Sequence, residues 1–185
     1  MEFVALLAKL DKILDELKID YLITGGIAVG AWSRPRHTAD IDIIVEIVNA
    51  EKVGKLIVKL KENFKGYIDI EQAQDALRRR GEFNMIEQDY GIKIDFWFST
   101  GSGYDKEKFC HSRQRKIGGR LVRFISPEDL IISKLIWSQK AGGSERQIDD
   151  IKSVLAVQGK RLDKKYLQKW IGKLDLENEW KIIGE

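Results

Sequence analysis

Two aspartates open an otherwise apolar run, Asp40-Ile41-Asp42-Ile43-Ile44-Val45. The β-branched residues predict a strand that is central and covered on both faces beyond its second Asp. Because side chains alternate along a strand, Asp40 and Asp42 must project from the same face, roughly 7 Å apart. Two like charges at that spacing raise each other's pKa unless a cation neutralises them. The pair is therefore either two solvated acids at a strand entrance or a site for a hard divalent ion such as Mg²⁺.

Strand and helix patterns surround this run. A β-prone segment at residues 21–23 leads into Gly25-Gly26, which we expect to form a turn before a short helix that Pro35 ends. The remaining predictions for the first part of the chain are a helix at 2–18, a helix at 51–63, an ambiguous segment at 67–81, a hairpin of strands at 83–88 and 92–98, and a second hairpin at 115–125.

The pattern becomes helical from Ser126 onward. Ser126 is placed as an N-cap, Pro127 occupies the first helical position, and acids follow in the first turn. Apolar residues then recur at helical spacing to the end of the chain, with breaks at Gly142-Gly143 and Gly159. We therefore expect an α+β fold, in which a core of residues 1–125 has helices packed on a mixed β-sheet and residues 126–185 form a C-terminal helical subdomain. The two parts should make one compact unit.

Composition narrows the class of protein further. The chain has 185 residues and a formal net charge of +3, which permits an anionic partner without requiring one. A single cysteine, Cys110, excludes an intramolecular disulfide framework and favours a reducing compartment. Charged residues interrupt the apolar N-terminal segment, so it resembles neither a signal peptide nor a membrane span. We expect a soluble cytoplasmic protein with no membrane partner.

Two further features give the Asp40/Asp42 pair chemical meaning. Gly25-Gly26 lies between a strand and a helix, where backbone N–H groups can approach a phosphate closely. Asp95 lies inside a second apolar strand, where its charge requires either a metal or a buried salt bridge with Lys93 or an arginine. Three acids on two strands beside a glycine turn would suit metal ions that clamp a phosphoryl transfer.

The segments 22–26, 36–45 and 94–96 together resemble the signature of the DNA polymerase beta-like nucleotidyltransferase superfamily. The resemblance implies a nucleotidyltransferase fold in the first half of the chain. It implies that Asp40, Asp42 and Asp95 are the catalytic residues and hold Mg²⁺ or Mn²⁺ against a nucleoside triphosphate (NTP), Asp95 helping to deprotonate the acceptor. The nucleotide-binding residues it implies are Gly25 and Gly26 at the β and γ phosphates, with Arg36 and Thr38 as further contacts.

A second resemblance lies in the helical part. Residues 126–130 with Lys134, followed by residues 144–147 and Asp150, are similar to a motif of small bacterial nucleotidyltransferases related to the AbiEii toxins of type IV toxin-antitoxin systems. The resemblance implies that Lys134 meets the nucleotide phosphates, that Asp150 or its neighbour Asp149 supports it, and that an antitoxin is a partner. Without the resemblance, Lys134 would be a solvated lysine and Asp150 would form a surface ion pair with Arg146.

Other residues are assigned by their surroundings in the sequence. Trp97, Trp137 and Trp170 occupy apolar positions and are predicted to lie in the core rather than to stack on bases. Three basic clusters could bind an RNA backbone or could be solvated faces. They comprise residues 78–80, then Arg113, Arg115, Lys116, Arg120 and Arg123, and finally Lys160, Arg161, Lys164, Lys165 and Lys169.

These features predict a metal-dependent nucleotidyltransferase that moves NMP from an NTP to a hydroxyl group and releases pyrophosphate. The predicted acceptors are an RNA or tRNA end, a protein side chain or a small molecule, and one setting is the toxin of a toxin-antitoxin pair. The alternative is a non-catalytic nucleotide-binding or protein-binding module with the same fold. Metal-dependent phosphoester hydrolysis shares the carboxylates but does not account for Gly25-Gly26 or Lys134.

Overall fold

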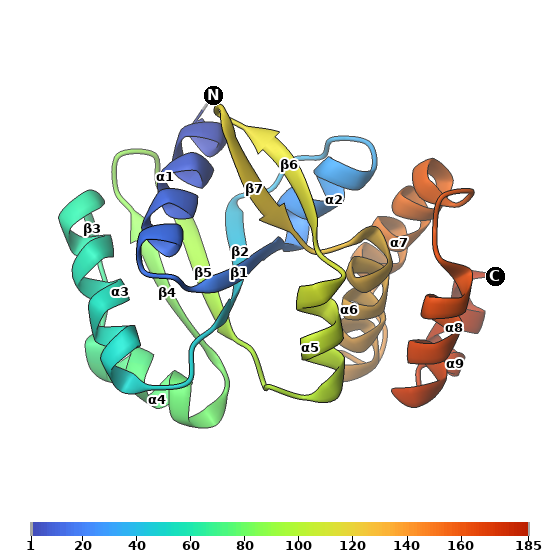
Figure 1. Ribbon diagram of the computed structural model, residues 1–185. Helices are drawn as coiled ribbons and strands as arrows, with labels where there is room; N and C mark the ends of the chain where they lie inside the picture. Colours follow the sequence, from blue (N-terminus) through green and yellow to red (C-terminus); the bar gives the residue numbers. More distant parts are fainter. Residues whose placement is uncertain (1, 185) are drawn as a thin grey trace.

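The computed structural model describes residues 2–184 as one sheet with helices on its faces and at one end (Figure 1). The strands are β1 (Asp20–Thr24), β2 (Asp40–Glu46), β3 (Gly66–Tyr67), β4 (Glu82–Glu87), β5 (Ile92–Phe98), β6 (Arg113–Ile117) and β7 (Arg120–Phe124). The helices are α1 (Glu2–Glu16), α2 (Gly25–Trp32), α3 (Ala50–Asn63), α4 (Ile70–Arg79), α5 (Gly103–Cys110), α6 (Pro127–Lys140), α7 (Glu145–Gln158), α8 (Lys164–Lys173) and α9 (Glu177–Ile183).

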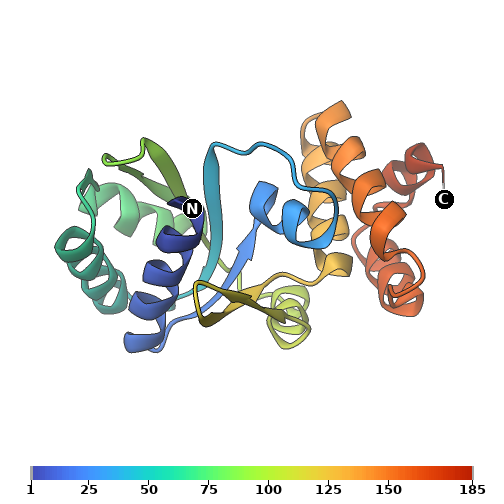
Figure 2. The ribbon, with the colours of Figure 1, turned by 90° about the horizontal axis from the view of Figure 1, so that it is seen from above.

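The sheet is mixed, with strand order β3-β4-β5-β2-β1-β7-β6. Strands β2 and β5 pair in parallel, as do β1 and β7, and the other neighbours are antiparallel. The two acid-bearing strands, β2 and β5, are therefore adjacent and run in the same direction. Figure 2 shows the C-terminal helices gathered at one end of the sheet, opposite α3 and α4.

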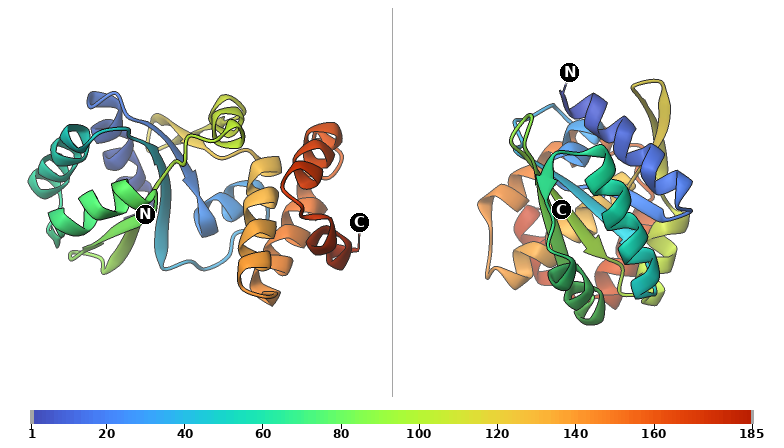
Figure 3. Two further views of the ribbon diagram at one scale, coloured as in Figure 1. Left: turned by 90° about the horizontal axis from the view of Figure 1, so that it is seen from below. Right: turned by 90° about the vertical axis from the view of Figure 1, so that its left-hand side faces the viewer.

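The core lies along the three central strands. Leu22, Ile41, Ile43 and Phe96 are fully buried there, and α1, α3 and α4 lie close to this side of the sheet (Figure 3). The sequence predicted that β2 is covered on both faces, but the structure covers only one. On the other face the side chains are half-buried, namely those of Asp40, Asp42, Ile44 and Glu46. Strand β2 is thus covered fully on one face and opens onto a cavity on the other.

Local sequence accounts for most element boundaries. Ser126 caps α6 by accepting a hydrogen bond from the Asp129 amide, with Pro127 at the start of the helix, as predicted. The ambiguous segment at 67–81 contains α4, which Asp69 caps through two amides. Gly25 is already the first residue of α2, so no separate turn stands between β1 and that helix.

Helix α5 is not among the elements predicted from the sequence. Ser102 caps it by accepting from the Asp105 amide 3.1 Å away. A serine followed three residues later by an acid is the signal that could have revealed it. At the other end of the molecule, α6 packs against α2, α7, α8 and α9. Within the described residues 2–184, no helix is long and apolar enough to cross a membrane.

Candidate functional site

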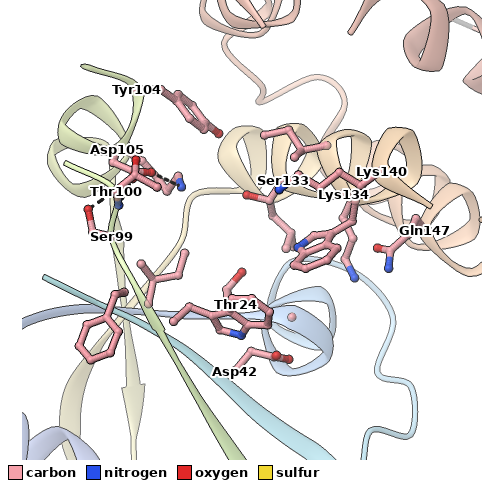
Figure 4. A pocket seen from close by; sticks show the side chains of 18 of the residues that line it. Thr24, Asp42, Ser99, Thr100, Tyr104, Asp105, Ser133, Lys134, Lys140 and Gln147 are labelled. Carbon is pink, nitrogen blue, oxygen red and sulfur yellow. Dashed lines mark hydrogen bonds and ion pairs between the residues drawn. The ribbon is translucent and has the colours of Figure 1, made fainter. Parts of the chain in front are cut away.

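A cavity of about 550 Å³ lies between the open face of β2 and the helices α6 and α7 (Figure 4). Its size falls within the range of ordinary ligand sites in proteins. One wall comes from β1, α2 and β2, and the opposite wall from α6 and α7. Predicted site residues that line it are Gly25, Gly26, Arg36, Asp40, Asp42 and Lys134.

The sheet register places the three acids side by side. Asp42 lies opposite Thr24 on β1 and opposite Asp95 on β5, while Asp40 lies opposite Lys93. In a parallel pair, opposite residues share a face, so Asp42 and Asp95 are lateral neighbours. The predicted common face of Asp40 and Asp42 is confirmed, because both side chains line the cavity.

Asp95 differs from the other two acids. Its side chain is only 5% exposed, and the Lys93 ammonium lies 2.6 Å from its Oδ1. The buried salt bridge weighed against a metal in the sequence is therefore present. Within the part of the chain that the structure describes, no three Asp, Glu, His or Cys side chains are arranged to hold one metal ion. The three-acid metal site therefore stays a prediction.

The pKa of Asp42 shows the electrostatic character of the cavity. Burial, and then the negative charges of Asp40 and Asp95, raise this pKa from 3.8 to about 6. A hydrogen bond from the Trp97 side chain and the charge of Lys134 oppose the shift. The neighbouring acid, Asp40, accepts a hydrogen bond at its Oδ1 from Thr38 Oγ1, which lies 2.6 Å away. Burial and the neighbouring acids therefore outweigh the nearby cations at the Asp42 carboxylate.

Gly25 and Gly26 bring the backbone of α2 against this charged group. A Cβ at Gly25 would lie 1.8 Å from Asp42 Oδ2, and one at Gly26 would lie 2.4 Å from Thr38 Oγ1. Gly25 also has φ +61°, a conformation that favours glycine. The side-chain oxygen of the N-cap residue Thr24 accepts no hydrogen bond from the first amides of α2. Those amides, at the positive end of the helix, remain available to an anion in the cavity.

Arg36, Lys134 and Asp150 form a connected ion cluster. Arg36 Nε lies 2.7 Å from Asp150 Oδ1, and its Nη2 lies 2.9 Å from Oδ2. Lys134 Nζ lies 2.8 Å from the same Oδ2. Burial would raise the pKa of Asp150, but the hydrogen bonds and charges of both cations outweigh it and lower that pKa. Asp149 is exposed, so the structure places Asp150, and not Asp149, beside Lys134.

Of the three tryptophans that the sequence analysis assigned to the core, two line the cavity instead. Trp97 and Trp137 line the cavity, their ring centroids are 5.3 Å apart, and their planes meet at 72°. Trp137 is 44% exposed, whereas Trp170 is buried as predicted. Helical spacing identified Trp137 as facing inward but could not distinguish a core from a cavity wall. These two residues are thus site residues that the sequence analysis missed.

The far end of the cavity is also polar. Asp105 and Lys108 are both 7% exposed and form an ion pair of 2.7 Å. Asp105 additionally accepts hydrogen bonds from the Thr100 amide and hydroxyl, at 2.7 and 2.5 Å. Figure 4 shows this group and Tyr104 on the side of the cavity away from Asp42. Apart from the Ser102 cap, no pattern in the sequence pointed to these residues.

Acidic partners neutralise part of the basic surface. Among the described residues, Arg78 and Arg79 pair with Asp75, and Lys169 pairs with Glu107. Arg120 pairs with Asp11 and Asp15, and Arg123 pairs with Asp20. Arg80, in contrast, lines the cavity and donates to the Ile47 carbonyl at 2.7 Å. Five of the thirteen basic residues in the predicted clusters therefore pair with acids. Among the described residues, seven others are exposed without such a pair, namely Arg113, Arg115, Lys116, Lys160, Arg161, Lys164 and Lys165.

Comparison with known proteins shows which fold this is. No family model and no curated protein matches the sequence. In structure, the chain is similar to ANT(2'')-Ia in complex with adenylyl-2''-tobramycin, with a TM-score of 0.62, 17% identity and coverage of 97% of this chain and 99% of that one. An antigenic nucleotidyltransferase-like protein from Paracoccidioides brasiliensis gives a TM-score of 0.58 at 20% identity, covering 92% and 86% of the two chains.

The lincosamide antibiotic adenylyltransferase LnuA, bound to lincomycin, gives a TM-score of 0.53 at 16% identity, covering 79% of this chain and 92% of that one. These similarities confirm the predicted fold class. The chain shares the fold of these nucleotidyltransferase structures, a mixed sheet followed by C-terminal helices.

Proposed function

We propose that this protein is a metal-dependent nucleotidyltransferase that transfers NMP from an NTP to a hydroxyl group. One observation carries the proposal: Asp40 and Asp42 project into the same cavity as the Gly25-Gly26 backbone and the Lys134 ammonium. A carboxylate pair facing phosphate-binding groups is the arrangement that nucleotidyl transfer requires. A turn of glycines or a surface lysine alone would not support the proposal.

The carboxylates fit a divalent cation. The raised pKa of Asp42 reflects its burial and then the negative charges of Asp40 and Asp95, and a bound Mg²⁺ or Mn²⁺ would offset both by stabilising the carboxylate. Asp40 and Asp42 would hold the ion, and Asp95 could join them only after leaving Lys93. When bound, the ion would neutralise charge on the phosphates and polarise the phosphorus under attack.

Phosphate binding falls to residues around the carboxylates. The free amides at the start of α2 would receive the β and γ phosphates. Lys134 is positioned by Asp150, which fixes its ammonium without consuming all of its three donors. Arg36 and Thr38 hold Asp150 and Asp40 through side-chain hydrogen bonds, so we assign them mainly positioning roles.

The proposed reaction is an in-line displacement. The acceptor oxygen bonds to the α-phosphorus, the bond from that phosphorus to the bridging oxygen of the β-phosphate breaks, and pyrophosphate leaves. The proton of the acceptor hydroxyl passes to a carboxylate, for which Asp95 is the predicted base. Since Lys93 pairs with Asp95, this role requires the lysine to move aside.

Among the predicted acceptors we favour a small hydroxyl compound over RNA. The ion pairs of Arg78, Arg79, Arg120 and Arg123 neutralise part of the positive charge that a nucleic-acid backbone would need, although the exposed Lys160, Arg161, Lys164 and Lys165 form no such pair within the described residues. The cavity continues past Asp42 to the polar group at Thr100 and Asp105, where a small acceptor could lie. That the protein is a toxin with an antitoxin partner remains a prediction from the sequence. In that role, the same carboxylates would catalyse the transfer.

The test is transfer of label from each α-labelled NTP to the RNA, protein and small-molecule fractions of a cell extract, with Mg²⁺ present. Wild-type protein should label one fraction, and the Asp40→Asn/Asp42→Asn double variant should label none. Asp149→Asn, an exposed acid outside the cavity, is the matched control and should behave as wild type. Absence of label together with absence of NTP binding would support the non-catalytic module, and free NMP without a labelled acceptor would support a hydrolase.

A further inference from the structure

Trp137 presents a large aromatic surface inside the cavity. Its side chain is 44% exposed although it lies on the face of α6 that lines the site. Tryptophan buries more apolar area than other residues when it packs, so leaving it open costs free energy. A ring left exposed within a cavity is best accounted for by a ligand that covers it.

The position of this ring relative to the carboxylates limits what the ligand can be. Trp97 on β5 lies diagonally across from Asp42 on β2, on the same face of the sheet, and packs edge-on with Trp137. The two rings therefore form an aromatic wall, Trp97 and Trp137, that begins at the carboxylate next to the proposed α-phosphate position. Lys134 lies about one turn before Trp137 on the same helix. A group covalently attached to the α-phosphate would reach this wall.

The face of the Trp137 ring is in contact with Lys140. Its ammonium lies 5.4 Å from the centroid of the Trp137 ring, the geometry of a cation–π contact. Lys140 is itself exposed and flexible, so a planar group can displace it at little cost. Phosphate, being anionic and strongly hydrated, gains nothing from an indole face, whereas a nucleobase stacks on one.

We propose that Trp137 is the platform on which the nucleobase of the NTP stacks. The inference rests on the proposed function, since it takes the triphosphate to lie at Asp42, Gly25 and Gly26. It assigns recognition of the base to the aromatic wall and recognition of the phosphates to α2 and Lys134. The chain would then bind a nucleotide through two separable contacts.

The experiment compares two ligands by calorimetry in Mg²⁺ and without acceptor: α,β-methylene-ATP, which carries a base and cannot be transferred, and inorganic tripolyphosphate, which has no base. Trp137→Ala should weaken binding of the nucleotide by about 5- to 100-fold, the range for loss of one base stack, and change tripolyphosphate binding less than about twofold. Trp137→Phe should retain most of the nucleotide affinity because it keeps a ring. Lys152→Ala, which removes an exposed lysine outside the cavity, is the control and should leave the ratio of the two affinities unaltered.

The outcomes separate this inference from the proposed function. If wild type binds both ligands but Trp137→Ala weakens them equally, or weakens neither, the stacking role is wrong and the nucleotidyltransferase proposal stands. The same holds if wild type binds tripolyphosphate as tightly as the nucleotide. If wild type binds neither ligand, both proposals fail. The unfolding temperature of each variant verifies that it is folded. Quenching of indole fluorescence by the nucleotide, compared between wild type and Trp137→Phe, verifies that the nucleotide contacts the Trp137 ring.

Discussion

The backbone of Gly25 lies against the carboxylate of Asp42, so close that a methyl group on Gly25 would stand 1.8 Å from Oδ2. Helix α2 therefore begins directly on a charged residue of the neighbouring strand. The glycine removes the side chain that would separate them, and its φ of +61° turns the chain from β1 into the helix. The same two residues supply the proposed phosphate-binding amide and the proposed metal ligand.

Gly25→Ala should disrupt the site more than the fold. Strain at positive φ should cost about 1–2 kcal/mol of unfolding free energy. Displacement of the Asp42 carboxylate should lower kcat by about 100-fold, as misplacement of a reacting group commonly does. Gly91→Ala carries the same strain at φ +68° with open space around it, and should lose stability but keep activity. Equal activity losses in the two variants would contradict this interpretation.

Asp150→Asn should destabilise the protein because it leaves Lys134 and Arg36 without their shared carboxylate. We expect a loss of about 2–3 kcal/mol in urea unfolding, below the 3–5 kcal/mol of fully buried pairs, since the Arg36 side chain is 27% exposed. The folded protein lowers the pKa of Asp150 below its ordinary value of 3.8. The stability difference between wild type and Asp150→Asn should therefore be fully present above pH 3.8 and should disappear as the pH falls through the lowered pKa of the folded state. Asp149→Asn should change stability by less than about 0.5 kcal/mol. A similar loss in both variants would remove the special role of Asp150.

Lys93→Met should strengthen metal binding if Asp95 can join Asp40 and Asp42. Removing the ammonium frees the Asp95 carboxylate and deletes a positive charge near the site, worth about 1 kcal/mol or roughly fivefold in affinity. The measurement is Mn²⁺ binding by electron paramagnetic resonance. Lys65→Met, which breaks a surface pair with Asp89, is the control and should leave the affinity unchanged. Persistence of the gain after Asp95→Asn is added would show that Asp95 takes no part.

His111 should make stability depend on pH. Its Nδ1 lies 3.2 Å from Oδ2 of the fully buried Asp129, which also accepts from Ser126 and Tyr166. The hydrogen bond to Asp129 raises the pKa of His111 above 6.5, and burial opposes the shift. The charged pair thus stabilises the fold fully below pH 6.5, and this contribution fades as pH rises through the folded pKa.

The measurement is the free energy of unfolding of wild type and His111→Gln between about pH 5.5 and 8.5. The advantage of wild type should be largest at the acidic end and shrink towards the alkaline end. His37→Gln alters the other, exposed histidine and should give a flat difference. A wild-type advantage that grows with pH would have the wrong sign.

Local sequence predicted what depends on neighbours in the chain. Alternation along a strand placed Asp40 and Asp42 on one face, and the Ser126-Pro127 signal marked the start of α6. It could not predict contacts between distant segments. Arg36 and Asp150 are 114 positions apart, and no local pattern in either segment refers to the other. The parallel pairing that sets Asp95 beside Asp42 is likewise a property of the sheet.

Apolar patterning was wrong where a buried surface faces a cavity instead of the core. Ile44 on β2 and Trp137 on α6 occupy positions that a hydrophobic pattern assigns to the interior, yet both line the site. An apolar side chain has the same sequence signature in either setting. The pairing of Lys93 with Asp95 was foreseen as one of two possibilities, and only the three-dimensional arrangement distinguished them.

The most direct test of nucleotidyl transfer at Asp40 and Asp42 is to follow two labels on the same NTP, one in the α-phosphate and one in the γ-phosphate. Wild type should place the α label on the acceptor and release the γ label in pyrophosphate, in equal amounts. Asp40→Asn and Asp42→Asn should abolish both, while Asp149→Asn should not. Arrival of the γ label on the acceptor, or undiminished transfer by either site variant, would contradict the central claim.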